Sequence, residues 1–321
     1  MELRKRITVI LLFVLLLLFG CGKDAYPAIP ADSSFIAAVN IQQPSVTFVN
    51  KDLKVFATWQ LEKAYTGATL IGQQYLLLYG NQLESADVYN LSTGEVAYSI
   101  ATGVGVTNAI YAPNKKILYI SNGKTNRVTA YTNQGEQIAE QKVGNYPMSM
   151  VTHGQNLYVV NYKDTKLSVL DAESLEAKDK WQIPKSSHGM IILEKRKELW
   201  LGGHGAGMKP NTTVDIFDIN KGQKDRELSL PMMPIGFAID DDRIYVVSHG
   251  QSQLYEVNDE GHVLSAQEIG ANPFAVQLFE QYVVVAGYDD QTLYFMKNND
   301  VTKKVKVDKG PFQLIVREMS E

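Results

Sequence analysis

Short apolar runs dominate the chain after residue 34, and none of them sustains the 3.6-residue period of an amphipathic helix. Asn, Gly, Asp and Pro break these runs at short intervals, which is the pattern of strands joined by turns. One strand type recurs at spacings of 40, 42, 40, 42, 45 and 38 residues, with starts near Phe35, Tyr75, Ile117, Leu157, Leu199, Ile244 and Tyr282. The pattern therefore predicts one unit repeated seven times.

Each unit contains four predicted strands. The recurring strand is followed by a second, as at 167–171, and a turn then leads to a third, as at 138–143. A Gly-x-x-Pro turn, as at 144–147, precedes a fourth short strand, as at 274–278. Four antiparallel strands in about 42 residues form one propeller blade, whereas solenoid repeats are shorter and sandwiches do not repeat their own sequence. We predict an all-β, seven-bladed β-propeller of four-stranded antiparallel blades over residues 35–321.

The reading frame of the repeat also predicts how the ring closes. The domain begins with the second strand of a blade, at 35–40, and ends with an unpaired inner strand at 311–317. We expect the C-terminal strand to pair with the N-terminal one and to complete blade 1, which removes two exposed sheet edges.

Several repeats resemble a known family. Tyr158-Val-Val-Asn161, Tyr119-Ile-Ser-Asn122 and the Gly-x-x-Pro turns are similar to the YVTN-type repeats of bacterial extracytoplasmic seven-bladed propellers. Blades 1 and 2 depart from the pattern, because other residues replace the Gly-x-x-Pro turn there. The resemblance implies the fold and leaves the chemistry open, since the family mixes binding modules, scaffolds and a few enzymes.

The N-terminus reads as an export signal. Arg4, Lys5 and Arg6 precede an apolar run at 7–19, which as a helix is about 20 Å long, too short for a hydrocarbon core of roughly 30 Å. Residues 18–21, Leu-Phe-Gly-Cys, resemble a bacterial lipobox, which implies cleavage before Cys21 and lipid on its sulfur. We predict a signal peptide at 1–20, a polar tether at 21–34, and anchoring through lipidated Cys21 to the extracytoplasmic face of the cell membrane or the outer membrane.

Composition excludes several classes of protein. Lys and Arg total 31 against 35 Asp and Glu in 321 residues, a formal charge of −4. The sequence also has no basic stripe, so we expect no nucleic-acid partner. The single cysteine, Cys21, rules out an intramolecular disulfide, a Cys-rich zinc site and a redox thiol pair. We therefore expect no cofactor, apart from a divalent metal ion that histidines could hold.

Three of the five histidines fall where the repeat brings loops to one face. His204 and His249 each follow the second strand, in blades 5 and 6, and His188 opens the inner strand of blade 5. Tyr162 occupies the same row in blade 4, and Asp289 lies nearby in blade 7. Imidazole ligates metals and titrates near neutrality, so the three could form a metal or acid–base site, or simply stand apart in solvated loops.

Two functional classes remain open. The first is a non-enzymatic binding or scaffold module, lipid-anchored outside the cytoplasm, that presents its loop-rich face to an envelope protein, a glycan or a small ligand. The second is a hydrolase or lyase of the lactonase type with a polar, histidine-bearing funnel. No nucleophile elbow and no His-Glu-x-x-His motif is present, and the Gly-rich insertion at 203–213 reads as a flap over the funnel mouth. Outer-membrane protein assembly, by analogy with eight-bladed lipoproteins, is disfavoured by the blade count.

Overall fold

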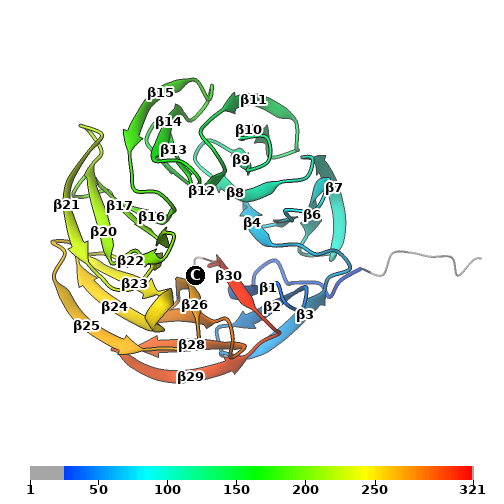
Figure 1. Ribbon diagram of the computed structural model, residues 1–321. Helices are drawn as coiled ribbons and strands as arrows, with labels where there is room; N and C mark the ends of the chain where they lie inside the picture. The colour runs from blue at the N-terminus through cyan, green and yellow to red at the C-terminus, as the bar shows by residue number, and fades with distance from the viewer. Residues whose placement is uncertain (1–24, 320–321) are drawn as a thin grey trace, which may run out of the picture.

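The computed structural model describes residues 25–319, and Cys21 with the signal sequence lies outside them. Seven four-stranded antiparallel sheets surround a central axis, which confirms the predicted propeller (Figure 1). The 3₁₀-helix η1 (His249–Gln251) is a single turn, and no helix among the described residues is long and apolar enough to cross a membrane.

The blades follow one another around the ring in sequence order, each with its first strand innermost. Blade 1 contains β30 (Pro311–Arg317), β1 (Phe35–Asn40), β2 (Ser45–Asn50) and β3 (Val55–Gln60), and blade 2 contains β4 (Gly67–Ile71), β5 (Tyr75–Tyr79), β6 (Ser85–Asn90) and β7 (Glu95–Ala101). Blade 3 contains β8 (Val106–Ala112), β9 (Ile117–Asn122), β10 (Arg127–Thr132) and β11 (Gln137–Lys142), and blade 4 contains β12 (Pro147–His153), β13 (Asn156–Asn161), β14 (Lys166–Asp171) and β15 (Ala177–Gln182).

The other three blades have the same plan. Blade 5 contains β16 (Ser187–Leu193), β17 (Glu198–Gly203), β20 (Thr213–Asp218) and β21 (Gln223–Ser229), with the insertion hairpin β18 (Gly205–Ala206) and β19 (Lys209–Pro210). Blade 6 contains β22 (Pro234–Asp240), β23 (Arg243–Ser248), β24 (Gln253–Asn258) and β25 (Val263–Glu268). Blade 7 contains β26 (Pro273–Phe279), β27 (Tyr282–Gly287), β28 (Thr292–Lys297) and β29 (Asp300–Lys306).

Hydrophobic clusters fill the spaces between neighbouring blades. The two middle strands of each blade are almost wholly buried, because both of their faces meet an adjacent sheet. Trp59, Trp181 and Trp200 lie in the clusters between blades 1 and 2, 4 and 5, and 5 and 6. The outermost strands, such as β15 and β29, are instead mostly exposed and rich in lysine. Charges on these edges prevent pairing with other sheets.

Closure of the ring occurs as the sequence predicts. Strand β30 pairs antiparallel with β1, and Phe35 stands opposite Arg317. The N-terminal and C-terminal strands therefore share blade 1, and β30 lies between the inner strands β26 and β4 in contact with both (Figure 1).

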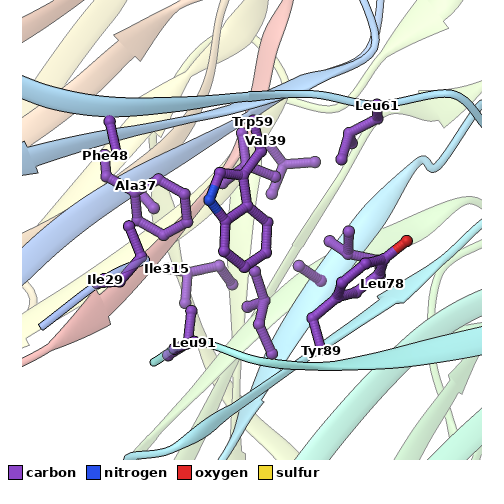
Figure 2. Close-up of a cluster of buried hydrophobic side chains, with 14 of the residues drawn as sticks. Ile29, Ala37, Val39, Phe48, Trp59, Leu61, Leu78, Tyr89, Leu91 and Ile315 are labelled. Carbon is purple, nitrogen blue, oxygen red and sulfur yellow. The ribbon is translucent and has the colours of Figure 1, made fainter. Parts of the chain in front are cut away.

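The residues that precede β1 differ from the polar tether expected at 21–34. Ile29 is fully buried in the cluster between blades 1 and 2, near Phe48 and Ile315 (Figure 2). Tyr26 stacks on Trp59, with ring centroids 5.1 Å apart, and the indole N–H of Trp59 donates to the carbonyl of Pro27 at 2.8 Å. The apolar side chains of this segment fill the groove between two sheets, so the packed part of the chain begins at Tyr26 rather than at Phe35.

Candidate functional site

Two positions of the repeat carry aromatic or imidazole rings at one end of the propeller. The first position is the residue directly after the second strand of a blade, which is Tyr162, His204, His249 and Tyr288 in blades 4 to 7. The second is the second residue of the inner strand, which is His188, Phe274 and Phe312 in blades 5, 7 and 1. Because inner strands start where second strands finish, both positions lie at the same end of the ring.

A β-bulge orients the second of these positions. In blade 4 the ladder pairs Pro147 with Asn161 and then Ser149 with Val160, so Met148 between them is skipped. The same break occurs at His188, Phe274 and Phe312, and among the seven blades only blade 2 lacks it. A bulge re-aims the side chain that it releases from the ladder. In six of the seven blades the repeat thus releases one side chain from the ladder at this end of the inner strand.

The structure brings His188, His204 and Tyr162 together. The imidazoles of His188 and His204 are stacked, with centroids 5.4 Å apart and planes inclined by 18°. The Tyr162 ring stands edge-on to both, at 6.5 Å from His188 and 6.0 Å from His204. These three rings come from β16 and from the loops that follow β13 and β17, so neighbouring blades 4 and 5 build them jointly.

His249 extends the set into blades 6, 7 and 1. Its ring centroid lies 5.9 Å from that of His204 and 4.2 Å from that of Phe274. Phe274 is in turn 5.1 Å from both Tyr288 and Phe312. At the other end of the set, the Tyr146 ring centroid lies 6.4 Å from that of Tyr162. We call this continuous set the ring row, and it comprises Tyr146, Tyr162, His188, His204, His249, Phe274, Tyr288 and Phe312.

The three histidines of the ring row favour the neutral state. Burial, together with the neighbouring His204 and His249, lowers the pKa of His188 to about 3. Burial also lowers the pKa of His204 and of His249, and the neighbouring Pro273 carbonyl, followed by the charge of Asp289, offsets part of this effect at His249. All three imidazoles are therefore uncharged at neutral pH.

Hydrogen bonding differs among the three imidazoles. The Ser149 hydroxyl lies 3.1 Å from Nδ1 of His188 and accepts the backbone N–H of Gly189 at 3.3 Å, so its own proton is available to Nδ1. Within residues 25–319, Nδ1 of His204 and Nδ1 of His249 are buried without any hydrogen-bond partner. A buried imidazole nitrogen left unpaired costs about 1–3 kcal/mol, so these two atoms mark a place where a ligand can supply the missing bond.

The remaining predicted residues occupy different surroundings. Asp289 is exposed at the rim of the ring row and acts on His249 through its charge. His153 ends β12 and His262 lies in the turn before β25, and their Nδ1 atoms are 3.5 Å and 3.4 Å from the carboxylates of Glu194 and Glu260, away from the ring row. No group of three or more His, Cys, Asp or Glu side chains within residues 25–319 is arranged to hold a metal ion.

Sequence reasoning missed half of the ring row. The residues that the sequence analysis does not name as site candidates are Tyr146, Phe274, Tyr288 and Phe312. Tyr288 stands in the repeat position of His204 and His249, which is a signal that could have identified it. From residue type alone, aromatic side chains are expected in the hydrophobic core. Their shared position in the repeat instead places them in the ring row.

The insertion hairpin of blade 5 borders the ring row. The backbone N–H of Asn211, just after β19, donates to the carbonyl of His204 at 3.0 Å. Met208, at the tip between β18 and β19, is fully exposed. The hairpin therefore stands beside His204 with an apolar tip in solvent, which agrees with the expected position of a flap.

Comparisons with known proteins identify the architecture. No protein-family model matches the chain, and no curated protein matches its sequence. A functionally unknown protein from Desulfotomaculum acetoxidans superposes with a TM-score of 0.75 at 9% identity, over 88% of this chain and 99% of that one. The likeness shows the fold alone.

Two further solved structures have the same architecture. BamB from Moraxella catarrhalis superposes with a TM-score of 0.60 at 10% identity, over 89% of this chain and 86% of that one. Dihydro-heme d1 dehydrogenase NirN, in complex with DHE, superposes with a TM-score of 0.65 at 10% identity. The match covers 90% of this chain and 66% of the NirN chain. At this level of identity the likeness shows the fold alone, and one fold can carry many functions.

Proposed function

We propose that this protein is a lipid-anchored, extracytoplasmic binding module that captures a small, ring-bearing ligand on the ring row. The observation that carries the proposal is the unbroken series of eight half-buried rings, in which two buried imidazole nitrogens have no partner within the described residues. Aromatic side chains with a few convergent polar atoms are the usual lining of a ligand site.

The chemistry of the ring row favours a planar or ring-shaped ligand. Aromatic faces and edges attract other rings at centroid distances of 4.5–7 Å, and such pairs add about 0.5–1.5 kcal/mol each beyond the area that they bury. Neutral imidazoles add polar atoms without adding charge, so His204 and His249 can bond to a ring substituent through Nδ1. Stacking would then supply affinity, and the imidazoles would supply orientation.

The proposed anchor comes from the sequence. Cys21 follows a short apolar run in a lipobox-like context, and it lies five residues before Tyr26. Ala25, the first described residue, is at the outer rim of blades 1 and 2, whereas the ring row runs from the loop before blade 4 to the inner strand of blade 1 (Figure 1). An anchor at this rim leaves the ring row free to meet ligands from the surrounding solution.

The test is ligand-detected NMR on the lipidated protein in phosphatidylcholine nanodiscs, with nicotinamide, uracil, phenol and methyl glucoside as probes. Two variants remove rings from the row, His204→Gln and Tyr146→Asn, and the matched control is His262→Gln in an exposed turn. We expect at least one ring compound to bind the wild type and the control, and to bind both ring-row variants at least about fivefold more weakly. Failure of all probes to bind, or equal binding to all variants, would contradict the proposal.

A second candidate function, hydrolysis or elimination of the lactonase type, is favoured by the same two imidazoles. A neutral imidazole with a free nitrogen can accept a proton from water or from a substrate carbon. The lowered pKa of His204 keeps that nitrogen available at neutral pH. Hydrolysis of γ-butyrolactone, followed by acid release at constant pH, tests this function, and activity that survives in His204→Gln would argue against it.

A further inference from the structure

A pocket of about 400 Å³ adjoins the Tyr146 end of the ring row. Loops of blades 2, 3 and 4 form it, at the part of the ring where the repeat positions hold Gly80, Ala68, Gly123 and Thr107 instead of rings. Gly123 is required there, since a Cβ atom on it would lie 2.7 Å from the Tyr146 ring. The small residues therefore leave open space directly beside the last ring of the row.

The charges that line this pocket are positive. Lys124 and Lys163 reach it from the loops after β9 and β13, and no carboxylate lines it. The Nζ atom of Lys163 lies 4.2 Å from the centroid of the Tyr146 ring, so the Lys163 ammonium group contacts the first ring of the ring row. Within residues 25–319, carboxylates hold Lys63 and Lys178 in ion pairs, whereas Lys124 and Lys163 form none.

Hydrogen bonds fix the loop that presents Lys124. The Asn122 side chain accepts the backbone N–H groups of Lys124 and Thr125, both at 3.0 Å, and donates to the carbonyl of Val104 at 3.1 Å. Gly105 has a φ of +110°, and a Cβ atom on it would lie 2.5 Å from the Lys124 side chain. The pocket wall is thus held in place by the fold before any ligand arrives.

Tyr146 occupies a backbone position that suits a smaller residue. It immediately precedes the inner strand of blade 4 and has a φ of 58°. The equivalent residues of blades 1, 3 and 7 are Gly310, Gly105 and Asn272, the types that accept the left-handed region most easily. Blades 5 and 6 place Ser186 and Met233 there with φ of 60° and 59°, so the repeat fixes this conformation and Tyr146 uses it to present a ring beside the pocket.

We propose that this pocket binds the anionic group of the ligand whose ring lies on the ring row, so that the ligand class is a planar ring compound carrying a carboxylate or a phosphate. This inference rests on the proposed binding function and specifies its ligand. The ring would stack at Tyr146 and Tyr162, and the anion would lie between Lys124 and Lys163. The neutral histidines farther along the row offer no competing positive charge.

Matched probes separate the two parts of the proposal. Nicotinate and nicotinamide share one ring and differ in charge, and phenyl phosphate and phenol form a second pair for a phosphate group. Affinities are measured by ligand-detected NMR with the lipidated protein in phosphatidylcholine nanodiscs. We expect each anion to bind about three- to tenfold more tightly than its neutral partner, with a difference that shrinks as salt rises.

Variants of the two lysines complete the test. Lys124→Gln/Lys163→Gln should remove the preference for the anions, so that nicotinate and nicotinamide bind with equal affinity, while Lys142→Gln, an exposed lysine of β11, should keep the preference of the wild type. A preference for only one of the two anions identifies the group and supports the inference. Equal affinity for charged and neutral probes overturns the anion site and leaves the ring site intact. Binding of no ring compound overturns the proposed function and the inference together.

Discussion

The guanidinium carbon of Arg317 lies 4.5 Å from the centroid of the Phe35 ring. The last strand of the propeller therefore contacts the first through a cation–π pair as well as through backbone hydrogen bonds. Arg317 is only 1% exposed. It donates to the Ser33 carbonyl at 2.9 Å, to the Ser33 hydroxyl at 2.8 Å and to the Gln73 carbonyl at 3.0 Å. One side chain therefore ties together β30, the segment before β1, and blade 2.

Replacing this arginine should destabilise the whole ring. Arg317→Leu removes the donors and leaves several carbonyl groups buried without partners, so we expect the free energy of unfolding to fall by about 3 kcal/mol. Urea titration followed by tryptophan fluorescence measures the change. Arg127→Leu, at the first residue of β10 where the side chain is 43% exposed, is the matched control and should stay within about 0.5 kcal/mol of the wild type. Equal effects in the two variants would show that Arg317 plays no special part in closure.

Truncation before Pro311 should have a larger effect than any point substitution. Loss of residues 311–321 removes the inner strand of blade 1, which unpairs β1 and exposes a long apolar edge beside the cluster between blades 7 and 1. We expect the truncated protein to aggregate or to unfold without a cooperative transition in circular dichroism. An unchanged melting temperature would contradict the role of β30 in closing the ring.

The repeat explains why the architecture was predictable. The middle strands of every blade are buried on both faces, so the same pattern of apolar residues recurs seven times along the chain. This recurrence identifies the four-stranded unit. It also shows that the first and last strands of the domain belong to one blade. The segment around Tyr26 and Ile29 follows no repeat. Its burial depends on a groove that exists only when blades 1 and 2 are assembled, so the local pattern of two prolines and small polar residues indicated a tether.

The candidate site was predictable in part for a related reason. His188, His204, His249 and Tyr162 were selected because polar or titratable rings stand out in loops, and the structure places them next to one another. Whether rings in neighbouring blades meet depends on the bulges and on the tilt of each sheet, which the sequence pattern does not encode. The lysine pocket also escaped prediction, because its walls come from three different blades.

Lipid attachment should depend on one atom. Cys21→Ser removes the thiol that we propose as the lipid acceptor, so we expect the variant to leave the detergent phase in Triton X-114 partitioning and to enter the aqueous phase. Mass spectrometry of the N-terminal peptide provides the independent measurement. Retention of a covalent lipid in Cys21→Ser would contradict the proposed anchor.

The anchor should also hold a particular rim of the propeller near the membrane. Cys21 lies five residues before Tyr26, which is packed against Trp59, and five residues span at most about 17 Å. A fluorophore attached at Glu95→Cys, beside this rim, should therefore transfer energy to a headgroup acceptor more efficiently than one at Asp225→Cys in blade 5. Equal transfer from both sites would mean that the propeller tumbles freely on its anchor.

Acidification should weaken the fold through the histidines of the ring row. The pKa of His188 is about 3 in the folded protein against about 6.5 in an unfolded chain, so below pH 6.5 the unfolded state binds protons that the folded state does not. The contribution of His188 to stability is therefore complete above pH 6.5 and is lost progressively as pH falls toward 3. It amounts to about 2 kcal/mol between pH 7 and pH 5, and His204 and His249 shift in the same direction.

A variant can assign this pH dependence to His188. Phe274 and Phe312 occupy the same repeat position in blades 7 and 1, so His188→Phe places a ring that the fold already accommodates there. We expect the fall in unfolding free energy between pH 7 and pH 5 to be about 2 kcal/mol smaller in His188→Phe than in the wild type. His262→Phe, at an exposed turn, should reproduce the pH dependence of the wild type. If His188→Phe and His262→Phe behaved alike, the imidazole of His188 would have to be as easily protonated in the folded state as in solvent, contrary to its buried position against His204.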